Sequence, residues 1–337
     1  MMGSGTRILV TGAAGFVGYH VANRLLAAGC DVLGLDNFSA YYDVALKERR
    51  AALLEAHPGF RMARISVDDM PATEAVWRDF APDIVLHLAA QPGVRYSIDH
   101  PEAYITANLI ATFNVLELAR HTKPKHLLVA STSSIYGANT QLPFDELQRC
   151  ATPVSLYAAT KGATELMGHS YAHLFGVPMT FFRFFTVYGP WGRPDMAPFK
   201  FTKAIAQGTP IDVYNHGDMA RDFTFVGDLA EAVFRLIDVV PGASPAVDGD
   251  SLSPVAPFRV VNIGQGRPVQ LLDFIGEIEQ ALGVKAIMNM LPMQEGDVYA
   301  TEASSALLER LTGYVPTTPV SVGVPEFVRW YRDYHQR

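Results

Sequence analysis

Short apolar runs alternate with segments of helical periodicity through the first half of the chain. The strand-like runs are Arg7–Thr11, Asp31–Asp36, Ile84–Ala90 and His126–Ser131. The segments with a helical pattern are Phe16–Ala28 and Tyr104–His121. Strands that alternate with helices in this way predict an α/β fold, in which crossover helices join parallel strands.

The rhythm changes near residue 189. A predicted helix at Ser155–Phe175 and a β-rich run at Met179–Val187 precede the segment Gly189–Pro194, whose glycines and prolines interrupt both patterns. We therefore predict one domain at 1–188 and a smaller α/β lobe, mainly for substrate, at 189–337, with some later segments returning to the first sheet. Further predicted elements are a helix at Pro198–Gln207, a strand at Ile211–Tyr214, a helix at Gly227–Val239 and a last segment at Pro325–Tyr334.

Composition narrows the class of protein. Of 337 residues 49% are hydrophobic and 18% charged, which allows large buried cores, and no apolar run approaches the length of a membrane span. No signal-peptide pattern opens the chain and only Cys30 and Cys150 are present, so we expect a cytoplasmic protein. A net charge of -7 argues against nucleic-acid or anionic-membrane partners. Basic residues in the second half instead suit a small phosphorylated ligand; they are Arg193, Lys200, Lys203 and Arg221.

A glycine triad follows the first predicted strand. Gly12 permits the tight turn, Gly15 lets the backbone approach a pyrophosphate, and Gly18 allows close packing of the helix that follows. Asp36 ends the second predicted strand, where a carboxylate binds ribose hydroxyls and repels a 2′-phosphate, and no arginine follows at 37–42. The pattern predicts NAD rather than NADP as cofactor. The alternative is a glycine turn without a nucleotide.

Tyr157 and Lys161 stand four residues apart on a predicted helix, so both side chains leave the same face. A nearby cation favours phenolate, and a tyrosine with a lowered pKa can act as a base near neutrality. Thr132 lies at the end of a buried strand, where its hydroxyl can bind a substrate hydroxyl. This set predicts redox chemistry at a carbinol carbon, against the alternative of an ordinary surface pair.

Three longer stretches extend these motifs, at 35–47, 183–196 and 211–218. With the glycine loop, Leu88–Arg95 and the Tyr157 motif, they make the chain resemble the extended short-chain dehydrogenase/reductases, and within them the UDP-glucuronate 4-epimerases. The resemblance implies a Rossmann-type doubly wound sheet with a smaller C-terminal substrate lobe, tightly bound NAD, and a catalytic set of Thr132, Tyr157 and Lys161.

The predicted sites follow from these motifs and the resemblance together. The cofactor-binding residues are Gly12, Gly15, Phe16, Val17, Gly18, Asp36, Asn37, Leu88, Ala89, Ala90, Tyr157 and Lys161. The residues predicted to bind the UDP-sugar are Thr186, Arg193, Lys200, Val213, Tyr214, Arg221 and Asp297. By the resemblance, Arg221 contacts the diphosphate and Asp297 the uridine ribose.

The implied reaction is a transient oxidation at C4 of the sugar, rotation of the 4-keto intermediate, and return of hydride to its other face. For a uronate this intermediate is a β-keto acid, which loses carbon dioxide unless the carboxylate is held near the carbonyl plane. Arg193 is the predicted holder, because a guanidinium matches a carboxylate with two donors. Its alternative is a structural or diphosphate-binding arginine. Thr186 stands where UDP-glucose 4-epimerases usually carry asparagine. The smaller threonine side chain leaves room for a carboxylate.

Other functions remain open in the sequence. Related dehydratases carry Asp-Glu after the catalytic threonine and related decarboxylases usually a glutamate, whereas this chain has Ser133 and Ser134. A UDP-glucose 4-epimerase, a UDP-glucuronate decarboxylase and a non-catalytic NAD sensor are the alternatives. The helices at Tyr104–His121 and Ser155–Phe175 resemble the pair that forms a homodimer interface in the family. His169 and His173 have the spacing of a helical metal pair but no third ligand motif, so we predict no metal.

Overall fold

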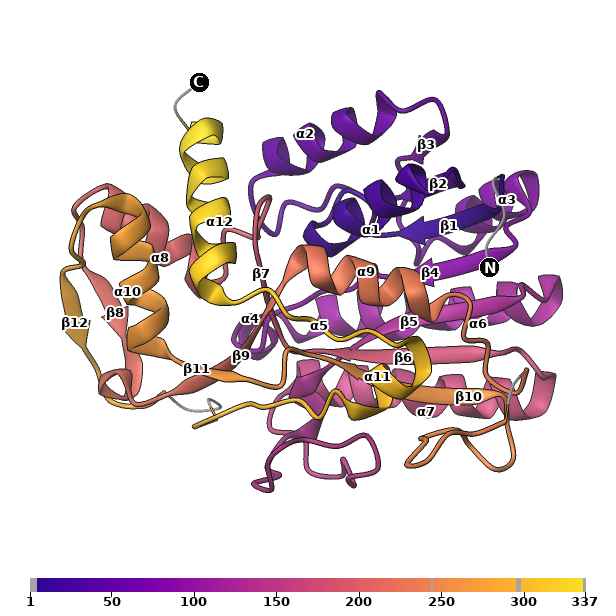
Figure 1. The fold of residues 1–337 in the computed structure, drawn as a ribbon. Helices are drawn as coiled ribbons and strands as arrows, with labels where there is room; N and C mark the ends of the chain where they lie inside the picture. Colours follow the sequence, from indigo (N-terminus) through magenta and orange to yellow (C-terminus); the bar gives the residue numbers. More distant parts are fainter. Residues whose placement is uncertain (1–4, 244, 295–297, 336–337) are drawn as a thin grey trace.

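The computed structural model describes residues 5–243, 245–294 and 298–335 (Figure 1). Its strands are β1 (Arg7–Thr11), β2 (Asp31–Leu35), β3 (Phe60–Ala63), β4 (Ile84–His87), β5 (His126–Thr132), β6 (Met179–Phe184), β7 (Thr186–Tyr188), β8 (Ile211–Val213), β9 (Ala220–Phe225), β10 (Phe258–Ile263), β11 (Pro268–Gln270) and β12 (Met288–Met290). The α-helices are α1 (Phe16–Ala27), α2 (Val44–Glu55), α3 (Met70–Phe80), α4 (Tyr96–Asp99), α5 (Pro101–Tyr104), α6 (Ala111–Thr122), α7 (Leu156–Phe175), α8 (Ala197–Ala206), α9 (Val226–Leu236), α10 (Leu271–Leu282), α11 (Ala306–Thr312) and α12 (Val320–His335). Other helical turns are η1 (Ile105–Ile110, a π-helix), η2 (Ser133–Tyr136) and η3 (Tyr214–Gly217).

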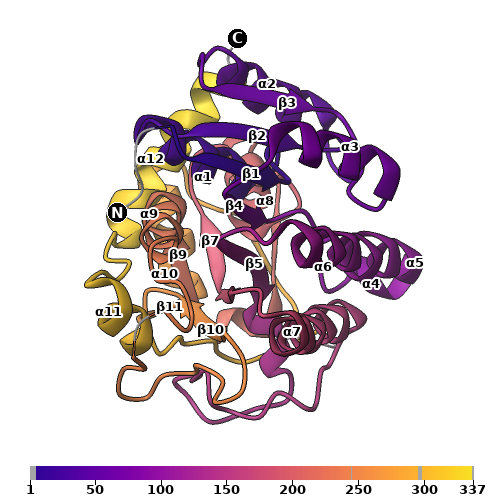
Figure 2. The same cartoon turned by 90° about the vertical axis from the view of Figure 1, so that its right-hand side faces the viewer.

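A parallel sheet forms the centre of the larger lobe. The described residues give it seven strands in the order β10-β6-β5-β4-β1-β2-β3. Figure 2 shows α1 and α9 on one face and α6 and α7 on the other. Helices on both faces, with the order reversing beside β1, confirm the predicted doubly wound α/β fold.

The strands are apolar on both sides because both faces of the sheet are covered. In β1, Ile8 and Val10 join the core under α1 and α9, whereas Leu9 joins the core under α3, α6 and α7. In β6, Phe182 and Phe181 separate in the same way.

The predicted β-rich run at Met179–Val187 is divided at Phe185. β6 belongs to the large parallel sheet, whereas β7 pairs with β9 in another sheet with β11. Phe185 itself packs beside Tyr136 and Phe144. The chain therefore passes between sheets within a run that reads as a single strand, because both sheets accept extended apolar residues.

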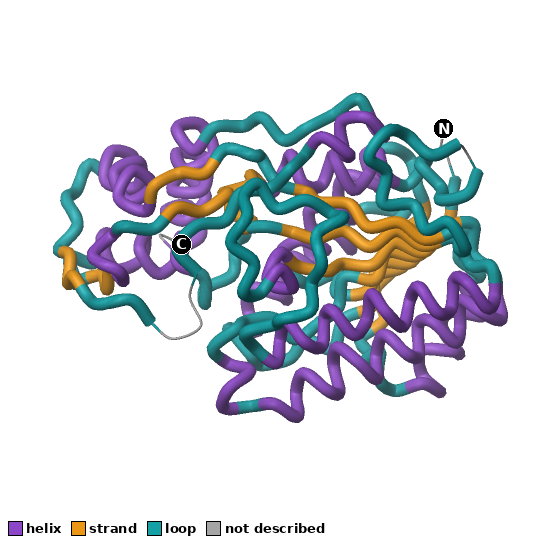
Figure 3. Tube along the Cα trace, turned by 90° about the horizontal axis from the view of Figure 1, so that it is seen from below, coloured by secondary structure: helices purple, strands orange, loops and turns teal. Residues whose placement is uncertain are grey.

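The smaller lobe has its own core. β7, β9 and β11 form one sheet, β8 and β12 pair in parallel, and apolar side chains of α8, α10 and α12 pack around them. Later segments also lie on the large sheet: α9 and α11 pack on the α1 side, and β10 is its edge strand. Figure 3 shows the strands of the large sheet side by side above a layer of long helices. The division at residues 188 and 189 therefore stays a prediction.

The predicted helix at Tyr104–His121 contains a π-helical turn, η1, between α5 and α6. Asn108 is fully buried there. Its side chain accepts from the Gln91 backbone N–H at 2.8 Å and donates to Thr160 Oγ1 at 3.0 Å. The wider turn places an amide between the segment after β4 and the helix that carries Tyr157 and Lys161, in keeping with the frequent occurrence of π-turns at functional sites.

Candidate active site

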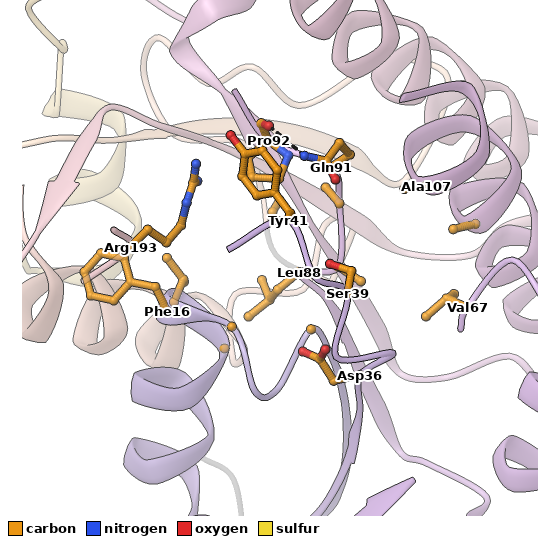
Figure 4. A pocket seen from close by; sticks show the side chains of 18 of the residues that line it. Phe16, Asp36, Ser39, Tyr41, Val67, Leu88, Gln91, Pro92, Ala107 and Arg193 are labelled. Carbon is orange, nitrogen blue, oxygen red and sulfur yellow. Dashed lines mark hydrogen bonds between the residues drawn. The ribbon is translucent and has the colours of Figure 1, made fainter. Parts of the chain in front are cut away.

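One cavity lies at the carboxyl ends of the parallel strands, where doubly wound folds bind ligands. All of the residues predicted to bind the cofactor line it, as do Thr132 and Arg193. Figure 4 shows Tyr41 and Arg193 next to one another, with Asp36 and Ser39 further along the cavity. The structure thus brings together residues that the sequence assigns to the nucleotide, the chemistry and the sugar.

The glycine loop has no room for side chains. A Cβ at Gly12, whose φ is +72°, would lie 2.9 Å from the backbone nitrogen of Ala89. A Cβ at Gly18 would lie 2.0 Å from the carbonyl oxygen of Gly12. Thr11 Oγ1 accepts from the backbone N–H groups of Leu88 and Ala89 at 3.1 and 3.0 Å, which holds the next loop against this turn. The close backbone packing fits a pyrophosphate at the start of α1.

Asp36 marks the ribose end of the cavity. The carboxylate is buried and accepts from the backbone N–H groups of Ala14 at 3.1 Å and Phe38 at 2.8 Å. Lys47 Nζ lies 3.8 Å from Asp36 Oδ1 and donates to Ser39 Oγ at 3.1 Å. A fixed carboxylate at the end of β2 fits the ribose hydroxyls of NAD. The sequence prediction missed Lys47, because α2 carries it back to Asp36 from outside the 37–42 window.

The catalytic candidates come from β5 and α7. Thr132 ends β5, and Ser155 caps α7 by accepting from the Ala158 N–H at 3.1 Å. This cap begins the helix two residues before Tyr157, so Tyr157 and Lys161 lie one turn apart and both reach the cavity. Lys161 is only 2% exposed. The structure therefore places the hydroxyl, the phenol and the ammonium in one buried site.

Burial raises the pKa of Tyr157 above its ordinary 10.0, while a hydrogen bond with Thr132 and the charge of Arg193 oppose that rise. Burial lowers the pKa of Lys161 to about 8, and the carboxylate of Glu165 opposes that fall. At neutral pH Lys161 thus carries its proton and Tyr157 keeps its own. A phenol of this kind needs additional positive charge beside it before it can act as a base.

A closed hydrogen-bond network lies behind Lys161. Arg183 donates to both oxygens of Glu165, from Nε at 3.1 Å and from Nη2 at 2.8 Å. Its Nη1 donates to the Tyr136 hydroxyl at 3.0 Å and to the Glu146 carbonyl at 3.5 Å. All three nitrogens of the guanidinium therefore have protein partners.

Arg193 lies at the cavity wall and is paired differently. Its Nε donates to Asp195 Oδ1 at 3.0 Å, and its Nη2 donates to Asp195 Oδ2. Asp195 thus takes Nε and Nη2 and leaves Nη1. Arg193 can therefore still present donors to a ligand in the cavity.

A second cavity holds two of the predicted substrate residues, Thr186 and Arg221. Its wall is rich in hydroxyl groups and includes Ser133, Ser134 and Thr301. Arg221 Nη1 donates to the Tyr299 carbonyl oxygen at 3.1 Å, which fixes the guanidinium at the edge of β9. A hydroxyl-rich wall that includes the guanidinium of Arg221 suits a phosphorylated sugar.

The other predicted substrate residues lie elsewhere. Lys200 is exposed on α8, Val213 is buried at the end of β8, and Tyr214 has the guanidinium of Arg95 above its ring at 5.1 Å. None of these residues lines the two cavities as the described residues define them. Asp297 lies outside the described residues, so the structure gives no account of it.

Sequence reasoning also missed Tyr41 and Asp195. The Tyr41 hydroxyl donates to Asp195 Oδ2 at 3.1 Å, and Tyr41 lines the cavity beside Arg193. The Arg-Pro-Asp spacing was a visible signal for the Arg193–Asp195 pair, but nothing in the sequence shows that Tyr41 lies next to it.

The histidines have ordinary partners. His169 Nε2 lies 2.9 Å from Ser253 Oγ, and His173 Nδ1 lies 2.8 Å from the Val255 carbonyl oxygen. They attach α7 to the loop before β10. Within the described ranges, no three His, Cys, Asp or Glu side chains gather where they could hold a metal ion. Across the same ranges, no helix is long and apolar enough to span a membrane.

Comparison with known proteins agrees with this site. The model of the NAD dependent epimerase/dehydratase family matches residues 8–246. A Rhizobium meliloti protein named "Probable UDP-glucuronate 4-epimerase" is 53% identical, with 98% of each chain covered. The UDP-glucuronate 4-epimerase 4 of Arabidopsis thaliana is 43% identical over 98% of this chain and 76% of its own. The crystal structure of a Bacillus cereus UDP-glucuronic acid 4-epimerase with UDP-glucuronic acid and NAD superposes with a TM-score of 0.87 at 30% identity, covering 98% and 100% of the chains.

Proposed function

Because this chain belongs to the NAD dependent epimerase/dehydratase family, we propose that it interconverts UDP-glucuronate and UDP-galacturonate by inverting C4 of the sugar. One observation carries the proposal: a single cavity joins the glycine loop and Asp36 to Thr132, Tyr157, Lys161 and Arg193. A nucleotide at one end, a base in the middle and a carboxylate-binding arginine at the other end are the parts that this reaction needs.

NAD fits the first end of the cavity. Gly12, Gly15 and Gly18 would hold its pyrophosphate at the start of α1, and Asp36 would accept from its adenosine ribose. When bound, NAD supplies the acceptor and donor of hydride, and the positive charge of its oxidised ring. The described contacts of Asp36 leave lone pairs free, since its two oxygens accept from two backbone N–H groups.

The protein's own groups manage the proton. We assign Thr132 to the C4 hydroxyl of the sugar, which it orients toward Tyr157. Tyr157 removes the hydroxyl proton and later returns it, as a general base and then acid. Lys161, protonated below its pKa of about 8, stabilises the phenolate. Each turnover ends with the proton back on the sugar oxygen, so the reaction needs no external acid or base.

The diphosphate must stay in place while the sugar turns over. We propose that Arg221, in the second cavity, holds the diphosphate, and that Thr186 in the same cavity lies beside the sugar. The 4-keto sugar can then rotate about its bonds to the diphosphate and present its other face. Lys200, Val213, Tyr214 and Asp297 remain predicted substrate contacts.

Arg193 is the group that makes a uronate acceptable. It lines the cavity that contains Thr132 and Tyr157, where a sugar carboxylate beside C4 would lie, and its Nη1 is not taken by Asp195. Ser133 and Ser134 place hydroxyls where a dehydratase carries its acid and base, so elimination lacks its proton-transfer groups. These features favour epimerisation over a lyase reaction.

The test is incubation of purified protein with UDP-glucuronate, with and without added NAD, followed by chromatography and proton NMR of the nucleotide sugars. We expect UDP-galacturonate without stoichiometric NADH. UDP-pentose as the main product would identify a decarboxylase, and turnover of UDP-glucose alone would identify a different 4-epimerase. Retained NAD without turnover of any UDP-sugar would indicate a sensor.

We also propose that the protein is a homodimer joined through α6 and α7. Large apolar side chains are exposed on and next to these helices; they include Ile105, Phe113, Leu166 and Leu174. A second copy would cover them. Light scattering coupled to size-exclusion chromatography should give twice the mass of the chain, and Phe113→Asp with Leu166→Asp should give the mass of one.

We further propose a cytoplasmic location, where NAD and nucleotide sugars are available. Cys30 and Cys150 are both free thiols, as expected for a reducing compartment. Fractionation of cells with an antibody against the chain tests this location, and recovery in a membrane or secreted fraction would contradict it.

A further inference from the structure

Asp195 stands between the cavity arginine and a tyrosine. It lies outside the set of residues that line the cavity, whereas Arg193 and Tyr41 both belong to that set. Its carboxylate accepts hydrogen bonds from Nε and Nη2 of Arg193 and from the hydroxyl of Tyr41. Asp195 therefore does not face a ligand itself but determines how Arg193 does.

The edge of the guanidinium that Asp195 occupies determines which N–H donors of Arg193 are left for a ligand. Asp195 takes the side edge, formed by Nε and Nη2. The end edge still offers one N–H of Nη2 and one N–H of Nη1, which together form another fork for a carboxylate. A planar guanidinium can thus hold two carboxylates in one plane. Held by Asp195, Arg193 presents this end edge in a fixed direction.

Tyr41 restricts the carboxylate in turn. Its ring lies 4.8 Å from the ring of Tyr96, and a Cβ at Gly93 would come within 2.7 Å of its hydroxyl oxygen. The pKa of Tyr41 is raised to about 12 by burial and by Asp195, so the hydroxyl remains a donor throughout the neutral range. Gly93 thus leaves the space in which this donor reaches Asp195.

The loop that carries the pair is itself attached to the larger lobe. His20 Nε2 lies 2.8 Å from the Pro190 carbonyl oxygen, and Arg50 Nη2 donates to the Trp191 carbonyl. Trp191 also packs against Tyr19 at 5.7 Å and Trp330 at 5.3 Å. Backbone and side-chain contacts therefore hold this loop on both lobes, so that the direction of Arg193 is defined relative to Tyr157.

We propose that Asp195, supported by Tyr41, is a positioning residue that directs the end edge of Arg193 toward the sugar carboxylate and so prevents its loss as carbon dioxide. The inference rests on the proposed function and deepens it. In the 4-keto sugar, decarboxylation breaks the C5–C6 bond, whose electron pair moves into the C4 carbonyl to give an enolate that takes a proton at C5. That pair can move only when the bond stands perpendicular to the carbonyl plane, and a carboxylate held near the plane retains its carbon dioxide.

The variant Asp195→Asn keeps the shape and removes the negative charge, so the positive charge of Arg193 is no longer compensated and its direction is less fixed. We expect kcat on UDP-glucuronate to fall about tenfold while KM does not rise, and the UDP-pentose fraction to increase about fivefold or more. Calorimetry should show the ratio of affinities for UDP-glucuronate and UDP-glucose increasing by about threefold, because the unpaired cation attracts the uronate. Tyr41→Phe should raise the UDP-pentose fraction less.

Glu231→Gln is the matched control. Glu231 is a comparably half-buried carboxylate that accepts from Arg24 at 2.7 Å, on the α1–α9 contact and outside both cavities. It should leave product partition and the affinity ratio unchanged. An Asp195→Asn protein that folds but makes no more UDP-pentose than wild type would overturn the proposal, as would a raised KM at unchanged partition. If Asp195→Asn does not fold, Tyr41→Phe decides, and an unchanged UDP-pentose fraction counts against the proposal.

The affinity ratio separates this inference from the proposed function. If wild-type protein binds UDP-glucuronate but does not epimerise it, the proposed function fails. An affinity ratio that still rises in Asp195→Asn would then show that Asp195 controls Arg193. An unchanged ratio beside normal epimerisation of the wild type would reject only the role of Asp195.

Discussion

Two arginine–carboxylate pairs lie on either side of the strand break at Phe185 and use the same chemistry differently. Arg183 and Glu165 have side chains only 6% and 11% exposed, and each nitrogen of Arg183 has a protein partner. Arg193 and Asp195 have side chains 20% and 23% exposed, and Asp195 takes Nε and Nη2 of Arg193 but leaves Nη1. Both arginines are paired with a carboxylate. The number of N–H donors that the protein leaves unused distinguishes the structural Arg183 from the ligand-binding Arg193.

Breaking the Arg183–Glu165 pair should have the largest effect on stability. Glu165→Gln leaves the buried charge of Arg183 uncompensated, so the free energy of unfolding should fall by about 3–5 kcal/mol. Denaturant unfolding measures it. The control Glu231→Gln, at a side chain that is 24% exposed against 11% for Glu165, should lose no more than about 1 kcal/mol. Equal losses in the two variants would mean that the Arg183 network contributes no more to stability than the partly exposed ion pairs of Glu231.

Stability in the region around Arg183 should also depend on pH near neutrality. Burial raises the pKa of Glu146 from 4.5 to about 7, so the folded protein binds a proton there that the unfolded chain has released. Stability should therefore fall as pH rises from 4.5 to 7, by roughly 3 kcal/mol at this site. Thermal unfolding across this range should show a flatter profile in Glu146→Gln. Parallel profiles in the variant and wild type would refute this assignment.

Breaking the Arg193–Asp195 pair should instead affect catalysis. Arg193→Ala should lower kcat/KM for UDP-glucuronate by about 10- to 100-fold, equivalent to about 1.4–2.7 kcal/mol, and release UDP-pentose. Its unfolding free energy should change by less than about 1 kcal/mol, because the half-exposed Asp195 can be hydrated. Product analysis by NMR and denaturant unfolding check the two parts. Wild-type turnover with no UDP-pentose would exclude a carboxylate-holding role.

The smallest effect is expected from Tyr136→Phe. The variant loses a hydroxyl that receives Arg183 and donates to Asn262 Oδ1 at 2.7 Å, but keeps the ring stacked on Phe144 at 4.5 Å. Unfolding free energy should fall by about 1 kcal/mol, with product partition unchanged. A change in UDP-pentose yield here would mean that the two pairs are coupled across the strand break.

Local spacing explains what the sequence could predict. The glycine loop, Asp36 and the Tyr157–Lys161 pair each depend on residues near in the chain, and the structure gathers them in one cavity. The sequence predicted that some later segments return to the first sheet, but it did not identify β10 as one of them or locate the strand break at Phe185, because an apolar run does not say which sheet receives it.

The contacts that distinguish the two pairs are long-range, and for that reason the sequence did not show them. Tyr41 reaches Asp195 from the loop after β2, and Tyr136 reaches Arg183 from η2. Each contact needs the fold before it exists. Sequence reasoning identified the arginine but not the groups that decide whether its donors are free.

The aromatic packing around Trp191 also makes the lobe junction optically visible. The chain has three tryptophans, and two of them, Trp191 and Trp330, lie 5.3 Å apart at this junction. The third, Trp77, is fully buried under the large sheet and donates to Thr122 Oγ1 at 3.0 Å. Trp77 therefore provides a constant emission background, while the junction pair provides a fluorescence signal that follows any movement of the Arg193 loop without an added label.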